Sequence, residues 1–151
     1  MLPAPRERVS RNTSDCVNEK IRRRTAANVQ RYAGTSPQEI ESRLRELDEE
    51  WDIERCLETM APTISLLGIG LGLTTSKKWF MLPLLVQGFF LQHALQGWCP
   101  PLTVLRHLGI RTQTEINEER YALKAMRGDF HGADDDGRYG DSRRAMLAAQ
   151  E

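Results

Sequence analysis

The feature that most constrains this chain is a long stretch that almost lacks charge. Across residues 59–105 the only formally charged residues are Lys77 and Lys78, although the 151 residues together carry 21 basic and 21 acidic groups. A soluble globular domain distributes charge over its whole surface, so this separation argues against one. The two lysines divide the stretch into segments 59–76 and 79–98. The sequence therefore predicts an all-α fold: an antiparallel two-helix transmembrane hairpin flanked by amphipathic cytoplasmic helices.

Tryptophans support this interpretation of the second segment. As a helix, the segment places Trp79 and Trp98 roughly 28 Å apart, close to the roughly 30 Å thickness of the hydrocarbon core. Tryptophan is enriched at both membrane interfaces. The alternative is a hairpin buried in a soluble bundle, but few other apolar residues are left to cover it.

Cap signals and apolar spacing outline the flanks. A basic helix is expected near residues 15–32, ended by Gly34. Ser36 to Glu39 form a capping box that starts a helix with the stripe Ile40, Leu44, Leu47 and Trp51. A second capping box, at residues 112–115, starts a helix that ends at Gly128. The sequence thus predicts five regions: a basic N-terminal region (1–35), an amphipathic helix (36–58), the hairpin (59–112), a second amphipathic helix (113–128) and a tail (129–151). The tail is expected to be mostly disordered, with a short helix near residues 143–150.

Charges beside the spans predict the orientation. Three arginines precede the hairpin and three follow it, against two lysines in its turn: Arg43, Arg45, Arg55, Arg106, Arg111 and Arg120. The positive-inside rule then places both termini in the cytoplasm of a multi-pass membrane protein. No secretory signal peptide is expected.

Small and polar residues inside the hairpin suggest how it packs. Ser65, Gly68, Gly72 and Gly88 are expected to permit close helix packing, with Gly68 and Gly72 also forming the interface between copies. The second span also carries the polar residues Gln87, Gln92, His93 and Gln96. These side chains either form hydrogen bonds between helices or line a polar path through an oligomer.

Two short motifs carry a resemblance to a known family. They are Gly97-Trp98-Cys99-Pro100 and Leu108-Gly109-Ile110-Arg111-Thr112, preceded by the pair Glu54-Arg55. With them the chain resembles the YgaP-like transmembrane domain family. The resemblance implies a bacterial inner-membrane hairpin that forms oligomers. Some members carry a fused rhodanese domain, which we do not expect here, so sulfur transfer is not implied.

Cys99 is the best candidate for chemistry. Arg106 and His107 nearby favour a thiolate, whereas the end of the second helix opposes one; a purely structural cysteine is the alternative. We expect no enzyme activity, metal, cofactor or nucleic-acid partner. The predicted function is a self-associating membrane scaffold or accessory subunit that offers helices 36–58 and 113–127 to a protein partner. A solute pathway and a thiol or redox role at Cys99 stay open.

Overall fold

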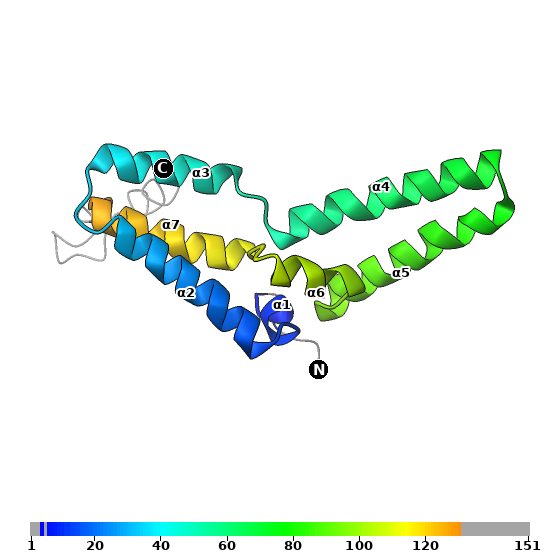
Figure 1. Cartoon of the computed structure of the whole chain (residues 1–151), viewed down its shortest axis with the longest axis horizontal. Helices are drawn as coiled ribbons and strands as arrows, with labels where there is room; N and C mark the ends of the chain where they lie inside the picture. Colours follow the sequence, from blue (N-terminus) through cyan, green and yellow to red (C-terminus); the bar gives the residue numbers. More distant parts are fainter. Residues whose placement is uncertain (1–3, 5, 131–151) are drawn as a thin grey trace, which may run out of the picture. The chain divides into compact units, whose positions relative to one another are not determined.

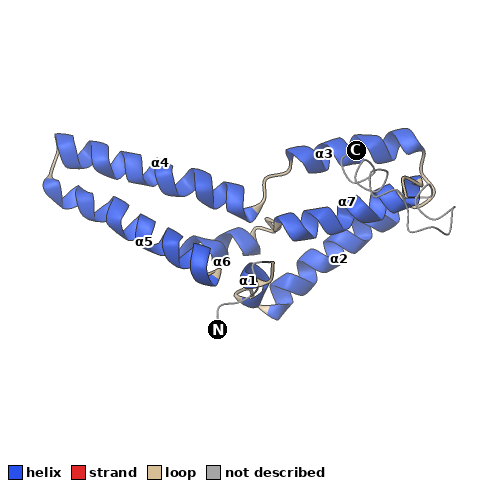
Figure 2. Cartoon of the chain, turned by 180° about the vertical axis from the view of Figure 1, so that it is seen from behind, coloured by secondary structure: helices blue, strands red, loops and turns tan. Residues whose placement is uncertain are grey.

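The structure is a computed structural model that describes residue 4 and residues 6–130. Within these residues every regular element is helical and none is a strand (Figure 2), which confirms the all-α class. Figure 1 shows the helices in chain order: α1 (Arg8–Arg11), α2 (Asp15–Arg31), α3 (Pro37–Glu49), α4 (Ile53–Thr74), the 3-10 helix η1 (Lys77–Phe80), α5 (Met81–Gln96), α6 (Pro100–His107) and α7 (Gln113–Arg127). The predicted tail lies, from residue 131 on, outside the described residues.

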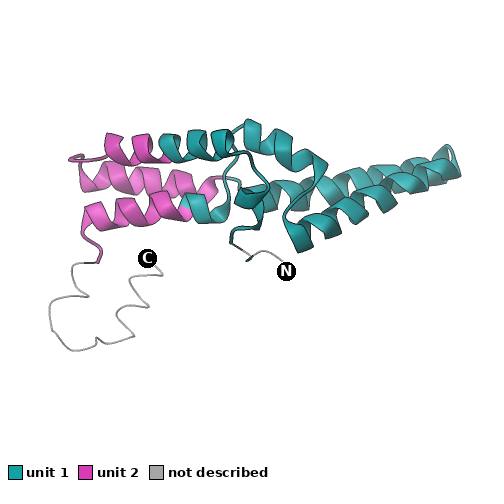
Figure 3. Cartoon of the chain, turned by 90° about the horizontal axis from the view of Figure 1, so that it is seen from below, with its two compact units in different colours: residues 1–24, 51–116 teal, residues 25–50, 117–151 magenta. Residues whose placement is uncertain are grey.

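The chain divides into two compact units (Figure 3). Unit 1 contains residues 1–24 and 51–116, and unit 2 contains residues 25–50 and 117–151. Two of the three boundaries fall inside α2 and α7, so each unit includes part of both helices, and the third falls between α3 and α4. Unit 1 thus combines the N-terminal residues with the hairpin, although the sequence analysis treated them as separate regions.

The predicted helix 36–58 is wrong at its C-terminal end. It starts as expected, because Ser36 and Glu39 form the reciprocal capping box. However, α3 ends at Glu49, and the extended residue Glu50 follows. Asp52 then caps a new helix by accepting a hydrogen bond of 2.8 Å from the N–H of Arg55. The sequence analysis missed this N-cap.

The hairpin of unit 1 consists of α4 and α5, which lie side by side and are joined through η1 (Figure 1). A Cβ atom at Gly68 would lie 2.7 Å from Cδ of Pro83, and one at Gly72 would lie 2.9 Å from the Phe80 ring. Both glycines therefore allow close packing within the hairpin, as expected. The same contacts occupy the side that we had also assigned to the interface between copies.

Gly88 does not pack as predicted. A Cβ atom there would meet no heavy atom within 4 Å, and the same is true of Gly70 on α4. These two glycines face open space, so neither is required for the packing of α4 against α5.

The second span ends for a different reason than the sequence suggested. Pro100 and Pro101 were expected to stop it, but α5 already ends at Gln96, with Gly97 in the left-handed conformation at φ 78°. The prolines instead begin α6, a helix that was not predicted. Proline suits the first turn of a helix because the N–H groups there have no intrahelical acceptor.

One helical stretch among the described residues is long and apolar enough to cross a membrane. It lies within Pro37–Thr74, and its apolar part is α4. Only 28 % of this apolar window is buried inside the chain, whereas the core helix of a soluble protein is mostly buried. Alone, α5 is shorter, with 16 residues.

A buried carboxylate connects the three helical segments of unit 2. Glu119 on α7 accepts hydrogen bonds from Asn28 of α2, at 3.3 Å, and from Arg43 of α3, at 2.9 Å. Ion pairs between Arg120 and Asp48 and between Arg127 and Glu41 link α7 to α3 again. The apolar residues of these helices are buried in the same unit: Ile40, Leu44, Leu47 and Leu123.

The glycine geometry gives a paired prediction. Gly68→Ala should destabilise the hairpin by about 1–3 kcal/mol, because its new methyl group overlaps Pro83. Gly70→Ala should be neutral or stabilising by up to about 1 kcal/mol, because its methyl group meets open space and alanine favours the helix. Thermal unfolding in mild detergent, followed by circular dichroism, measures both. Equal effects of the two substitutions would contradict the described packing.

Candidate functional site

Helix α1 and the residue after it donate hydrogen bonds to the C-terminal end of α5. Arg8 donates a hydrogen bond of 2.9 Å to the carbonyl oxygen of Ala94, and Asn12 donates one of 2.8 Å to that of Gln96. These bonds satisfy carbonyl groups that the end of a helix leaves without partners. A Cβ atom at Gly97 would overlap the backbone carbonyl of Arg8, so the approach of α1 requires glycine there.

Near this contact, the side chains of Glu54, His93 and Cys99 form a hydrogen-bonded row. Nε2 of His93 lies 3.1 Å from Oε2 of Glu54, and Nδ1 of His93 lies 3.7 Å from Sγ of Cys99. The guanidinium of Arg8 binds the second oxygen of Glu54 at 2.8 Å. Together with Arg8, the row joins α1, α4, α5 and the residue that precedes α6.

The charge on Glu54 is stabilised at neutral pH. The hydrogen bond from His93 lowers the pKa of this carboxyl most, and the bond from Arg8 adds to it, so that the pKa is about 2 despite the opposing effect of burial. Glu54 therefore acts as an acceptor for both neighbours.

Cys99 lies in an apolar setting. It is 3 % exposed and belongs to the buried cluster formed by Val9, Ile53, Leu57, Leu102 and Leu105. It occupies the N-cap position of the eight-residue helix α6. The sequence analysis placed it at the end of the preceding helix, where the partial charge is negative. The structure corrects this position: Cys99 lies at the start of a helix, although Pro100 and Pro101 lack two of the N–H groups that give a helix start its positive partial charge.

The neighbours that the sequence suggested for Cys99 have other roles. Arg106 is fully buried and bound to Glu115, and His107 is exposed and bonded to the carbonyl oxygen of Thr103. The partner that the structure supplies is His93. The spacing of residues in the sequence did not indicate that His93 pairs with Glu54, because these two residues come from different helices.

Arg106 binds several groups of unit 1. Its two terminal nitrogens bind the two oxygens of Glu115 at 2.7 and 2.8 Å, which is a bidentate pair. Asn18, Thr13 and the carbonyl oxygen of Ile110 accept its remaining hydrogen bonds. The sequence analysis counted Arg106 as a surface charge beside the membrane, whereas the fold neutralises it inside the protein.

The residues that carry the family resemblance have separate structural roles. Pro100 begins α6, and Gly109, at φ 85°, follows its end. Ile110 packs against the buried cluster, whereas Leu108 is exposed. Thr112 caps α7 together with Glu115. Arg55 lies 4.5 Å from the ring centroid of Trp51.

The polar residues of α5 do not form one stripe. Gln87 donates a hydrogen bond of 3.0 Å to the hydroxyl of Ser65 on α4, as an interhelical bond should. Gln92 is half-buried and Gln96 is exposed. His93 is 1 % exposed and is held by Glu54 and Cys99, so it is not placed on a polar path with the two glutamines.

No group of three or more metal-ligating side chains is placed around one point in the part of the chain that the structure describes. Glu54 and Cys99 contact opposite nitrogens of the His93 ring, which keeps them apart. Instead, the His93 imidazole lies between a carboxylate acceptor, Glu54, and a thiol, Cys99.

Comparison of the chain with protein-family models, with curated proteins and with solved structures finds no match.

The Arg106–Glu115 pair predicts a dependence of stability on acid. The pKa of Glu115 is lowered: burial alone would raise it, but the bonds from Arg106 and Thr112 outweigh burial. The unfolded chain therefore takes up this proton at a higher pH than the folded one. The stabilisation is complete above the ordinary pKa of 4.5 and is lost as pH falls through the lowered value.

Unfolding temperatures measured between neutral and acidic pH should consequently fall less steeply for Glu115→Gln than for the unchanged protein. Converted to free energies of unfolding, the two curves should differ in slope by at most about 1.4 kcal/mol per pH unit, the value for one proton. Parallel curves would show that this carboxylate does not contribute to acid unfolding.

Proposed function

We propose that this protein is a small membrane protein whose hairpin inserts into the bilayer. The residues of unit 1 outside 59–98, which we call the polar base, lie on one side of the membrane. One observation carries the proposal: apolar side chains occur on every side of α5, yet His93 is its only buried residue. A helix with apolar side chains on every side needs an apolar environment, and the described part of this chain does not supply one. Lipid does.

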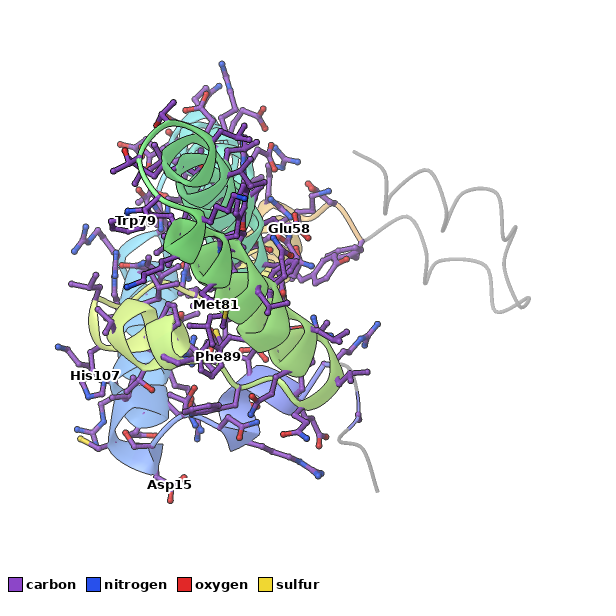
Figure 4. The ribbon with its side chains drawn as sticks, turned by 90° about the vertical axis from the view of Figure 1, so that its right-hand side faces the viewer. Asp15, Glu58, Trp79, Met81, Phe89 and His107 are labelled. Atoms are coloured by element: carbon purple, nitrogen blue, oxygen red, sulfur yellow. The ribbon has the colours of Figure 1, made fainter. Side chains whose placement is uncertain are left out.

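The surface of both hairpin helices has the same character. Trp79, Met81 and Phe89 lie exposed on the hairpin, which Figure 4 shows from the end that carries its turn. Other exposed apolar side chains of α4 and α5 include Leu66, Leu67, Leu73, Leu84, Leu85, Leu91 and Leu95. Contiguous apolar surface of this kind marks membrane or protein contacts.

The dimensions of the hairpin support a membrane. Helix α4, with 22 residues, spans about 33 Å, and α5, with 16 residues, about 24 Å, compared with a hydrocarbon core of roughly 30 Å. Trp98 is exposed near the base and Trp79 near the turn. Both tryptophans are thus where interfacial anchors are expected.

The proposed location is the bacterial inner membrane, with both termini in the cytoplasm. The resemblance to the YgaP-like family supports the membrane. The flanking arginines that are not buried, Arg43, Arg45, Arg55 and Arg120, support the orientation against the two lysines of the turn. We propose a scaffold or accessory subunit rather than an enzyme that acts through a large cleft.

Self-association is the second part of this proposal. The apolar stripes of α3 and α7, expected to receive a partner, contain residues that are buried in unit 2. The hairpin surface is therefore the better candidate for contact between copies. Gly88 faces open space on α5, and Gln92 lies one turn further along the helix. A small residue allows close approach, and an amide can pair with its symmetry mate.

The solute pathway is the weaker alternative. It relied on His93 together with Gln92 and Gln96, but His93 is bonded to Glu54 and Cys99. The remaining two glutamines provide little to line a path.

Insertion can be tested with two matched substitutions. Leu67 on α4 and Val104 on α6 are similarly exposed, at 62 % and 60 %, but only Leu67 lies near the centre of a proposed span. Leu67→Arg should weaken membrane insertion by about 2.5–3.5 kcal/mol and reduce the fraction that stays in membranes after alkaline extraction. Val104→Arg should leave that fraction unchanged. Complete extraction of the unchanged protein would overturn the proposal.

Self-association has its own pair of variants. Gly88→Ile should lower the copy number measured by native mass spectrometry in mild detergent, because the larger side chain prevents close approach. Gly70→Ile introduces the same side chain at an open position on α4 and should leave the copy number unchanged. The interface is wrong if Gly88→Ile has no effect or if both variants dissociate equally.

A further inference from the structure

The row Glu54–His93–Cys99 has a geometry that membrane insertion does not require. A thiol lies within hydrogen-bonding distance of one imidazole nitrogen, and a carboxylate lies within such distance of the other. A nucleophile beside a base that a third group orients is the arrangement that activates a side chain for reaction. Both the imidazole and the thiol are buried, at 1 % and 3 % exposure.

The carboxylate determines which nitrogen of His93 can accept a proton. Glu54 is an acceptor, so the proton of the neutral ring is on Nε2, which donates to Oε2. The lone pair of Nδ1 is then directed to Sγ of Cys99, 3.7 Å away. Arg8 binds the other oxygen of Glu54 and thereby keeps the carboxylate in position.

We propose that Cys99 is a reactive thiol for small hydroperoxides, with His93 as its proton acceptor and donor and Glu54 as a positioning residue. The thiol first transfers its proton to Nδ1, which gives a thiolate beside an imidazolium.

The reaction with a hydroperoxide balances without another reactant. The thiolate sulfur attacks the distal oxygen of ROOH, an S–O bond forms and the O–O bond breaks. The leaving alkoxide or hydroxide takes the proton from Nδ1 of His93, and the products are the sulfenic acid of Cys99 and ROH or water. Sulfur is oxidised by two electrons and the peroxide is reduced by two.

The surroundings of Cys99 favour a peroxide over an acyl substrate. Acyl transfer needs N–H donors for the oxyanion that forms, and the start of a helix would ordinarily provide them. Here Pro100 and Pro101 have no N–H group, and the next N–H, of Leu102, donates to the carbonyl oxygen of Cys99 at 3.1 Å. Displacement at a peroxide oxygen requires only a proton for the leaving group.

Burial restricts the substrate further. The thiol is enclosed by an apolar cluster, so a protein disulfide or a bulky charged molecule would have to displace α1 and α6 to reach it. A small, uncharged hydroperoxide fits this setting best.

The chain contains its own reference thiol for a test. Cys16 is exposed on α2. If exposure alone governed reactivity, Cys16 would be oxidised faster than the buried Cys99. The proposal predicts the opposite order.

The full-length protein in mild detergent is exposed to hydrogen peroxide for timed intervals, and the peroxide is then removed with catalase. The protein is unfolded, the remaining thiols are alkylated, and mass spectrometry of peptides quantifies the thiol lost at each cysteine. Because alkylation follows unfolding, access of the reagent does not affect the result.

We expect Cys99 to be oxidised at least about tenfold faster than Cys16, which is below the roughly 10²–10⁴-fold that a positioned proton acceptor or donor typically supplies. His93→Gln should remove this advantage while the rate at Cys16 is unchanged. Glu54→Gln should slow oxidation of Cys99 and shift its pH profile, which a purely structural role would not do. Equal or faster oxidation of Cys16 in the unchanged protein would overturn the proposal without any variant. So would an unaltered rate at Cys99 in a folded His93→Gln protein.

Discussion

The buried guanidinium of Arg106 is the interaction on which the polar base of unit 1 depends. A buried charge is tolerated only when it is paired and its hydrogen-bonding groups are satisfied. Arg106 meets this condition by collecting acceptors from the residues after α1, from the start of α2, from the turn after α6 and from Glu115. These segments are thereby held around one point, and α6 is fixed beside the end of the hairpin.

The hairpin itself follows a different constraint. Its helices pack closely because Gly68 and Gly72 leave room for Pro83 and Phe80, and Gln87 adds one bond to Ser65. Nothing in the described part of the chain covers the outer apolar surface. Unit 1 therefore has two halves: a polar base held by ion pairs and an apolar hairpin whose outer surface is not covered. Each half suits a different solvent, which favours the proposal of a membrane protein.

The candidate thiol site lies where these two halves of unit 1 meet. Arg8 serves both, because it caps the last turns of α5 and binds Glu54. His93 belongs to the apolar helix, yet its two ring nitrogens reach groups of the base. The site thus depends on the short helix α1, whose contact requires glycine at position 97. The same contact keeps bulky reactants away from the thiol.

The sequence by itself determined the helical class, both capping boxes and the apolar segments of the hairpin, because these depend on local composition and spacing. It did not determine where α3 and α5 end, since the N-cap at Asp52 and the left-handed conformation of Gly97 depend on local geometry that the apolar spacing did not indicate. Only the tertiary structure brought Glu54, His93 and Cys99 together and buried Arg106 against Glu115. Such contacts join residues far apart in the chain, and they form because each buried polar group must find a partner that periodicity does not encode.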